Sequence, residues 1–105
     1  MNLTRTLESI INYAVEVTEP DKIILFGSMA NGTDNVYSDV DLLIISDSTI
    51  NKKEAAIRIR NFAHQYSLKT DVLIYSFSEF EKEQRTSYSF IKAAIESGKI
   101  IYEKY

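Results

Sequence analysis

Two apolar runs of the sequence open on carboxylates whose spacing could do chemistry. Asp39 and Asp41 open the run that continues to Ser46, and Asp71 opens the run DVLIY. Residues two apart in a strand share a face, so Asp39 and Asp41 would lie roughly 6–7 Å apart along the backbone. If the two runs are neighbouring strands, the three carboxylates converge at one edge of a sheet and repel one another. A divalent cation would remove that repulsion, so the pattern favours a metal site.

The donor atoms indicate which metal this site would take. Carboxylate oxygens favour Mg²⁺ or Mn²⁺ over zinc, and the chain has no cysteine that could supply a thiolate. Mg²⁺ is usually held by one or two carboxylates together with the phosphates of a substrate. A nucleoside triphosphate is therefore the expected companion of the metal.

Gly27-Ser28 fits the same interpretation. The pair follows the apolar run KIILF, and ten residues separate it from Asp39. Backbone N–H groups and a hydroxyl in a tight turn after a strand can hold a phosphate, and glycine lets the backbone approach it closely. Gly-Ser alone is a weak signal, and it gains specificity from the Asp-x-Asp that follows at the head of a buried strand.

The elements that would position these residues follow from the hydrophobic spacing. Helices are expected over residues 3–18, 51–66, 78–84 and 88–97, and strands over residues 22–26, 38–46, 70–76 and 99–103. Apolar residues on both faces of the 38–46 strand predict a central strand that is covered on both sides. The order of elements predicts one α/β (α+β) domain over residues 1–105, with a small mixed sheet covered by helices.

Composition limits the classes of partner. A net charge of −3, without a Lys/Arg cluster, argues against a protein whose main work is to bind nucleic acid. No apolar run approaches membrane-spanning length, and the charged N-terminus does not read as a signal peptide. We therefore expect a cytoplasmic protein that binds neither nucleic acid nor membrane.

The motif as a whole resembles the signature of the nucleotidyltransferase superfamily related to DNA polymerase beta. Gly27-Ser28, ten intervening residues and Asp39-Val40-Asp41 match it at every spacing, and Asp71 in KTDVLIY falls at the third carboxylate. The small size is similar to that of minimal nucleotidyltransferase (MNT) domains. The resemblance implies the polymerase beta-like fold and two Mg²⁺ ions, with Mn²⁺ as an alternative. It also implies that all three aspartates bind metal and are catalytic, while Gly27 and Ser28 contact the phosphates of ATP or another nucleoside triphosphate.

The resemblance further implies transfer of a nucleoside monophosphate, in the first place AMP, onto an acceptor. Larger relatives hold the acceptor in an added helical domain, for which 105 residues leave no room, so a separate protein is expected to present it. Minimal domains of this kind are paired with an all-helical HEPN protein in toxin–antitoxin modules. There the MNT domain is the antitoxin and can adenylylate the toxin.

One departure from the family pattern keeps other functions open. Asn31 stands where many relatives have an arginine, so the charge of the leaving pyrophosphate is less well compensated unless another residue supplies a cation. One alternative is a binding module that neutralises its partner by contact alone. Another is half of a small-molecule, antibiotic-type transferase, which would need a homodimer to build its acceptor pocket. Arg58 and Arg60 are expected on a solvated helix face, and His64 is expected to be structural.

Overall fold

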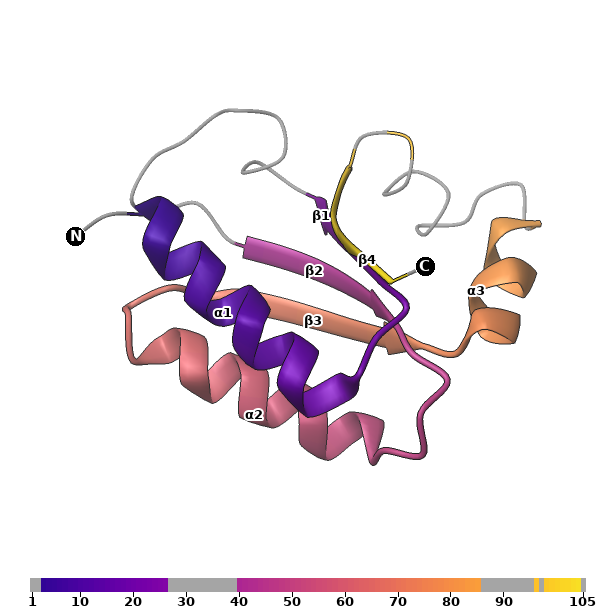
Figure 1. The fold of residues 1–105 in the computed structure, drawn as a ribbon, viewed down its shortest axis with the longest axis horizontal. Helices are drawn as coiled ribbons and strands as arrows, with labels where there is room; N and C mark the ends of the chain where they lie inside the picture. Colours follow the sequence, from indigo (N-terminus) through magenta and orange to yellow (C-terminus); the bar gives the residue numbers. More distant parts are fainter. Residues whose placement is uncertain (1–2, 27–39, 86–95, 97, 105) are drawn as a thin grey trace.

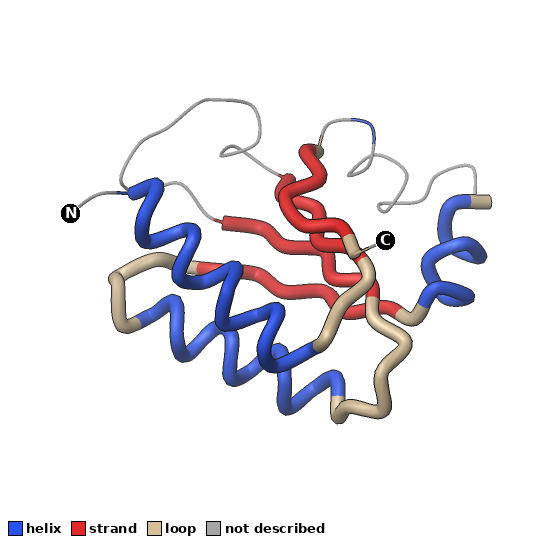
Figure 2. Tube along the Cα trace, in the orientation of Figure 1, coloured by secondary structure: helices blue, strands red, loops and turns tan. Residues whose placement is uncertain are grey.

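The computed structural model describes residues 3–26, 40–85, 96 and 98–104. Its elements are α1 (Leu3–Thr18), β1 (Lys22–Phe26), β2 (Val40–Ile45), α2 (Lys52–His64), β3 (Thr70–Tyr75), α3 (Phe77–Gln84) and β4 (Lys99–Glu103). The described strands form one mixed sheet in the order β3-β2-β1-β4. β2 and β3 are parallel, and β1 is antiparallel to both β2 and β4. Helices α1 and α2 lie side by side against one face of the sheet, and α3 follows the end of β3 (Figure 1, Figure 2).

This architecture confirms the predicted fold class and most of the predicted elements. Helix α2 is shorter than the expected 51–66, because Asn51 is its N-cap and accepts a hydrogen bond from the Glu54 backbone N–H. After α2 the chain turns at Ser67, which has a φ of 60°. The predicted helix over residues 88–97 falls almost wholly outside the described residues. None of the described helices has the length and apolar character needed to cross a membrane.

Strand β2 is buried on both faces, as its sequence predicts. Leu42 and Ile44 pack against α1 and α2 in the main core, which also includes Ile10 and Ile59. On the opposite face, Leu43 and Ile45 pack with Phe80 of α3 and with β1 in a second cluster. Within β2 only Asp41, the second residue of the strand, is half-buried rather than buried. The most deeply buried strand of the described sheet therefore carries a charged, half-buried residue near its N-terminal end.

Two serines after β2 fix the end of α1. The Oγ atoms of Ser46 and Ser48 donate hydrogen bonds to the Thr18 carbonyl oxygen at 2.6 and 2.8 Å. They satisfy a carbonyl that the helix itself leaves without a partner at its C-terminus. The backbone N–H of Asp21 then donates to the Ile45 carbonyl oxygen at 2.7 Å. These contacts start β1 antiparallel to β2 and hold the register of the pair.

The start of α3 is tied to the neighbouring connections. Ser76 and Glu79 form a capping box, in which each side chain accepts a hydrogen bond from the other residue's backbone N–H. Asp47 accepts the Phe77 backbone N–H at 2.9 Å, and Lys52 of α2 pairs with Glu79. The helix that covers the second core cluster is thus anchored to the chain that follows β2.

The Glu79 contacts predict a dependence of stability on pH. Hydrogen bonds from Lys52 and from Ser76 lower the pKa of Glu79 from 4.5 to about 2. A carboxyl with a lowered pKa stabilises the fold above its unfolded-state pKa, and that contribution is lost as the pH falls through its folded-state pKa. Because Glu79 is exposed, we expect Glu79→Gln to cost less than about 1 kcal/mol of unfolding free energy at neutral pH. Urea unfolding should show the difference shrinking below pH 4.5 and vanishing near pH 2.

The matched control is Glu81→Gln on the same helix, where the side chain is also exposed. It should show no such pH-dependent difference from the wild type. A Glu79→Gln deficit that stays constant down to about pH 2 would exclude the Lys52 and Ser76 contacts as its source.

Candidate active site

Asp41 and Asp71 lie opposite each other on neighbouring parallel strands. The β2–β3 pairing aligns Asp41 with Asp71, and the alignment continues without a shift to Ile45 and Tyr75. Neighbouring strands lie about 4.8 Å apart, and residues paired in this way project from the same face. The expectation that the two acidic runs are adjacent strands is confirmed.

Both carboxylates line an open hollow of about 460 Å³. The described residues that line it come from β1, β2, β3 and α2, and are Phe26, Asp41, Arg60, Asp71, Val72, Leu73 and Tyr75. Asp71 is exposed and Asp41 is half-buried, so a ligand from solvent can reach the two acids. The volume lies in the range of small-molecule sites, which is roughly 300–1,000 Å³.

The remaining predicted site residues fall outside the described part of the chain. These are Gly27, Ser28 and Asp39, and Asn31 lies in the same gap. The described chain before Gly27 ends at Phe26, which pairs with Asp41 in the antiparallel β1–β2 ladder. The sequence segment that contains the Gly-Ser pair is therefore attached to the sheet directly beside Asp41.

The donor chemistry of the two aspartates fits a hard divalent cation. Among the residues that the structure describes, no group of three or more His, Cys, Asp or Glu side chains gathers as a metal site. Asp41 and Asp71 provide carboxylate oxygens from the same register position. Such a pair suits Mg²⁺, which commonly keeps water and phosphate oxygens as its other ligands.

Among the described residues, Arg60 is a charged lining residue that the sequence interpretation did not assign to the site. It is exposed, as expected for a solvated helix face, and in addition it lines the hollow of the carboxylates. Ile59 is fully buried, so Arg58 and Arg60 flank the buried stripe of α2 on opposite sides. Because Arg58 and Arg60 flank a buried residue, the sequence indicates that one of them faces β3. Only the packing of α2 shows which one.

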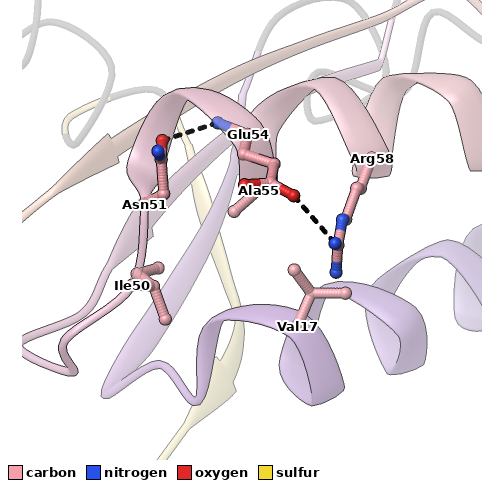
Figure 3. A pocket seen from close by; sticks show the side chains of 6 residues that line it. All are labelled: Val17, Ile50, Asn51, Glu54, Ala55 and Arg58. Atoms are coloured by element: carbon pink, nitrogen blue, oxygen red, sulfur yellow. Dashed lines mark hydrogen bonds and ion pairs between the residues drawn. The ribbon is translucent and has the colours of Figure 1, made fainter.

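Arg58 has a different environment. Its Nη2 atom donates to Glu54 Oε1 at 2.8 Å, four residues earlier on α2. The pair lines a smaller hollow of about 150 Å³ between α1 and α2, together with Val17 and the N-cap residue Asn51 (Figure 3). Two arginines of one helix thus serve separate surfaces.

The sequence of this chain matches a known protein family and is similar to named proteins. Residues 8–105 match the family described as "Polymerase beta, Nucleotidyltransferase". Two proteins of Methanocaldococcus jannaschii, both provisionally named protein adenylyltransferases, are similar in sequence. One is 41% identical over 70 residues, which are 65% of this chain and 67% of that protein. The other is 31% identical over 83 residues, which are 77% of each chain.

A solved structure shares the fold. It is that of the tri-AMPylated Shewanella oneidensis HEPN toxin in complex with MNT antitoxin. The match has a TM-score of 0.60 and 15% sequence identity, and covers 96% of this chain and 72% of the other chain. At this identity the likeness bears on the fold alone.

The opposed carboxylates predict two separate effects of Asp71→Asn. Like charges directly opposite each other destabilise a sheet, so the metal-free variant should match the wild type or exceed its unfolding free energy by a few tenths of a kcal/mol. Binding of Mn²⁺, followed by its electron paramagnetic resonance signal, should weaken by at least about tenfold because one ligand is lost.

Glu81→Gln removes the same charge from an exposed position on α3 and should leave both quantities unchanged. An Asp71→Asn protein with wild-type affinity for Mn²⁺ would remove Asp71 from the metal site.

Proposed function

Because this chain belongs to the polymerase beta nucleotidyltransferase family, we propose that it transfers AMP from ATP to a protein acceptor. The observation that carries the proposal is the alignment of Asp41 with Asp71 at an open hollow. Binding of a cation and a substrate would explain why a strand that is otherwise buried carries a carboxylate near its N-terminal end. The position of these two carboxylates supports the chemistry for which the family is named.

Each residue of the candidate site has its own role in the proposed reaction. Asp41 and Asp71, with Asp39, would hold two Mg²⁺ ions. When bound, these ions supply charge stabilisation for the entering and leaving oxygens of the displaced phosphoryl group. Gly27 and Ser28 contact the phosphates. Asp71 lies on the end strand of the described sheet and is exposed, so it can accept the proton of an incoming hydroxyl.

The reaction is a single displacement at the α-phosphorus of ATP. The acceptor oxygen forms a bond to that phosphorus, the bond to the bridging oxygen breaks, and pyrophosphate leaves. The acceptor hydroxyl loses its proton toward Asp71. Phe26, Leu73 and Tyr75 add an apolar wall beside the carboxylates, which suits the flat ring of a base or of an aromatic side chain.

The acceptor we propose is an all-helical protein of the HEPN type, with this chain as its antitoxin in the cytoplasm. Two curated relatives carry the name protein adenylyltransferase, and a structural relative is an MNT antitoxin bound to an AMPylated HEPN toxin. These names support a protein acceptor rather than a small molecule. The net charge of −3 gives no support for an acceptor made of nucleic acid.

Neutralisation by contact alone is the second candidate. It is favoured by Asn31, which supplies no charge at a position where many relatives carry an arginine. In that case the fold would present a binding surface, and neutralisation would not need the carboxylates.

The test is intact-mass analysis of a HEPN-type protein encoded beside this chain, after incubation with the chain, ATP and Mg²⁺. We expect the partner to gain the mass of one or more AMP units. Asp41→Asn should slow this transfer by at least about 100-fold, in line with the loss of one charge-stabilising group at a reacting centre. Glu81→Gln should transfer AMP at the wild-type rate.

A partner that keeps its mass, but is neutralised equally by the wild type and by Asp41→Asn, would establish contact without catalysis. AMP transfer that survives in Asp41→Asn would contradict the assigned role of this carboxylate.

A further inference from the structure

Arg60 brings a positive charge to the two carboxylates from outside the sheet. It belongs to α2, which packs on the opposite face of the sheet through Ile59 and Ala63. Its side chain nevertheless lines the hollow that contains Asp41 and Asp71. This is feasible because β3 is the end strand of the described sheet, so a side chain of α2 can reach around its outer edge.

Arg60 takes no part in the ion pairs among the described residues. Those pairs join Lys22 to Glu103, Lys52 to Glu79 and Arg58 to Glu54. Arg58 lines the smaller hollow between α1 and α2, where Figure 3 shows it paired with Glu54. The exposed guanidinium of Arg60 can therefore bind a ligand without breaking an ion pair of the described fold.

The order of the strands puts Arg60 on the side of the site away from β1. Strands β1 and β3 flank β2 on opposite sides, and Gly27-Ser28 follow directly after β1 in the sequence. Entering and leaving groups take opposite sides of the reacting phosphorus in an in-line displacement. In the proposed reaction the phosphates contact Gly27-Ser28, which follow β1 in the sequence, so we assign the acceptor to the side of β3 and Arg60.

We propose that Arg60 is an acceptor-binding residue, which holds a carboxylate of the acceptor protein next to the hydroxyl that receives AMP. The inference rests on the proposed function, because it assigns Arg60 to the acceptor of that reaction. A guanidinium binds a carboxylate through two parallel N–H donors, which fixes the direction of the bound group as well as its position.

A carboxylate is the anion that a protein acceptor offers. The two aspartates and the net charge of −3 repel an acidic segment at other points of this surface. Arg60, which lines the same hollow as Asp71, therefore selects where such a segment can bind. Arg60 raises the affinity for one orientation of the acceptor and leaves the affinity for the nucleotide unchanged.

The experiment compares two peptides by nuclear magnetic resonance titration of the full chain. One has a tyrosine between two pairs of glutamates, and the other has glutamines in their place. We expect the wild type to bind the acidic peptide about fivefold more tightly, as a partly exposed ion pair allows. Arg60→Ala should lose this preference, while Arg58→Ala, which removes the same charge from the same helix, should keep it.

A second titration uses a non-hydrolysable ATP analogue with Mg²⁺. Its affinity should stay within about twofold in Arg60→Ala, because the acceptor and not the triphosphate contacts this residue. A loss of about tenfold or more would instead make Arg60 a phosphate ligand and overturn the proposal. The proposal is also overturned if neither peptide binds, or if Arg60→Ala keeps the preference.

The two proposals fail in different ways. If the preference for the acidic peptide depends on Arg60 but no AMP is transferred to the partner protein, the proposed function is wrong. Arg60 then binds an anionic segment that is not the acceptor of an AMP transfer. If AMP is transferred at the wild-type rate and KM for the partner is unchanged in Arg60→Ala, the assignment of Arg60 is wrong and the proposed function stands.

Discussion

The parallel, unshifted pairing of β2 with β3 is the constraint on which the candidate site depends. It puts Asp41 directly opposite Asp71, on one face and about one strand spacing apart. A slip of one residue would turn one of the two acids toward the helices on the other face. That face is filled by the apolar core, where an unpaired carboxylate would cost several kcal/mol. The packing that specifies the register therefore also specifies the site.

The rest of the fold holds that register at the C-terminal end of β2 and along both of its faces. Beyond its C-terminal end, Ser46 and Ser48 bind the last carbonyl of α1, and Asp47 caps α3. Along its length, the strand is buried by α1 and α2 on one face and by Phe80 on the other. Asp41, near the N-terminal end of the strand, is half-buried and lines the hollow, so a ligand can approach it there. A reacting group on a packed strand is positioned more precisely than one on a loop.

The described residues that line the hollow carry charges of both signs. Two carboxylates lie opposite each other on the strand pair, and Arg60 lines the same hollow. The carboxylates favour a divalent cation and its phosphates, whereas the arginine favours an anion. Because β3 is the end strand of the described sheet, cation and anion sites are both reachable from solvent. This arrangement fits a reaction in which a nucleotide and a separate protein meet at one edge.

The sequence by itself determined the order of elements, the central position of β2 and which acidic residues could bind a metal. Alternation of apolar residues on both faces of residues 40–45 is enough to predict a covered strand, because only a central strand buries both faces. The spacing of Gly27-Ser28 and the aspartates was enough to indicate the family. Local spacing carries this information because strand and helix geometry repeat with a fixed period.

Only the tertiary structure decided what lies across from what. Nothing local to DVDLL or TDVLIY states that these strands are parallel and aligned, since pairing joins residues thirty positions apart. The role of Arg60 depends in the same way on packing, because Arg58 and Arg60 are equivalent in sequence until α2 is placed against β3 and α1. Distances within one element follow from the chain, whereas contacts between elements follow from the burial of their apolar faces.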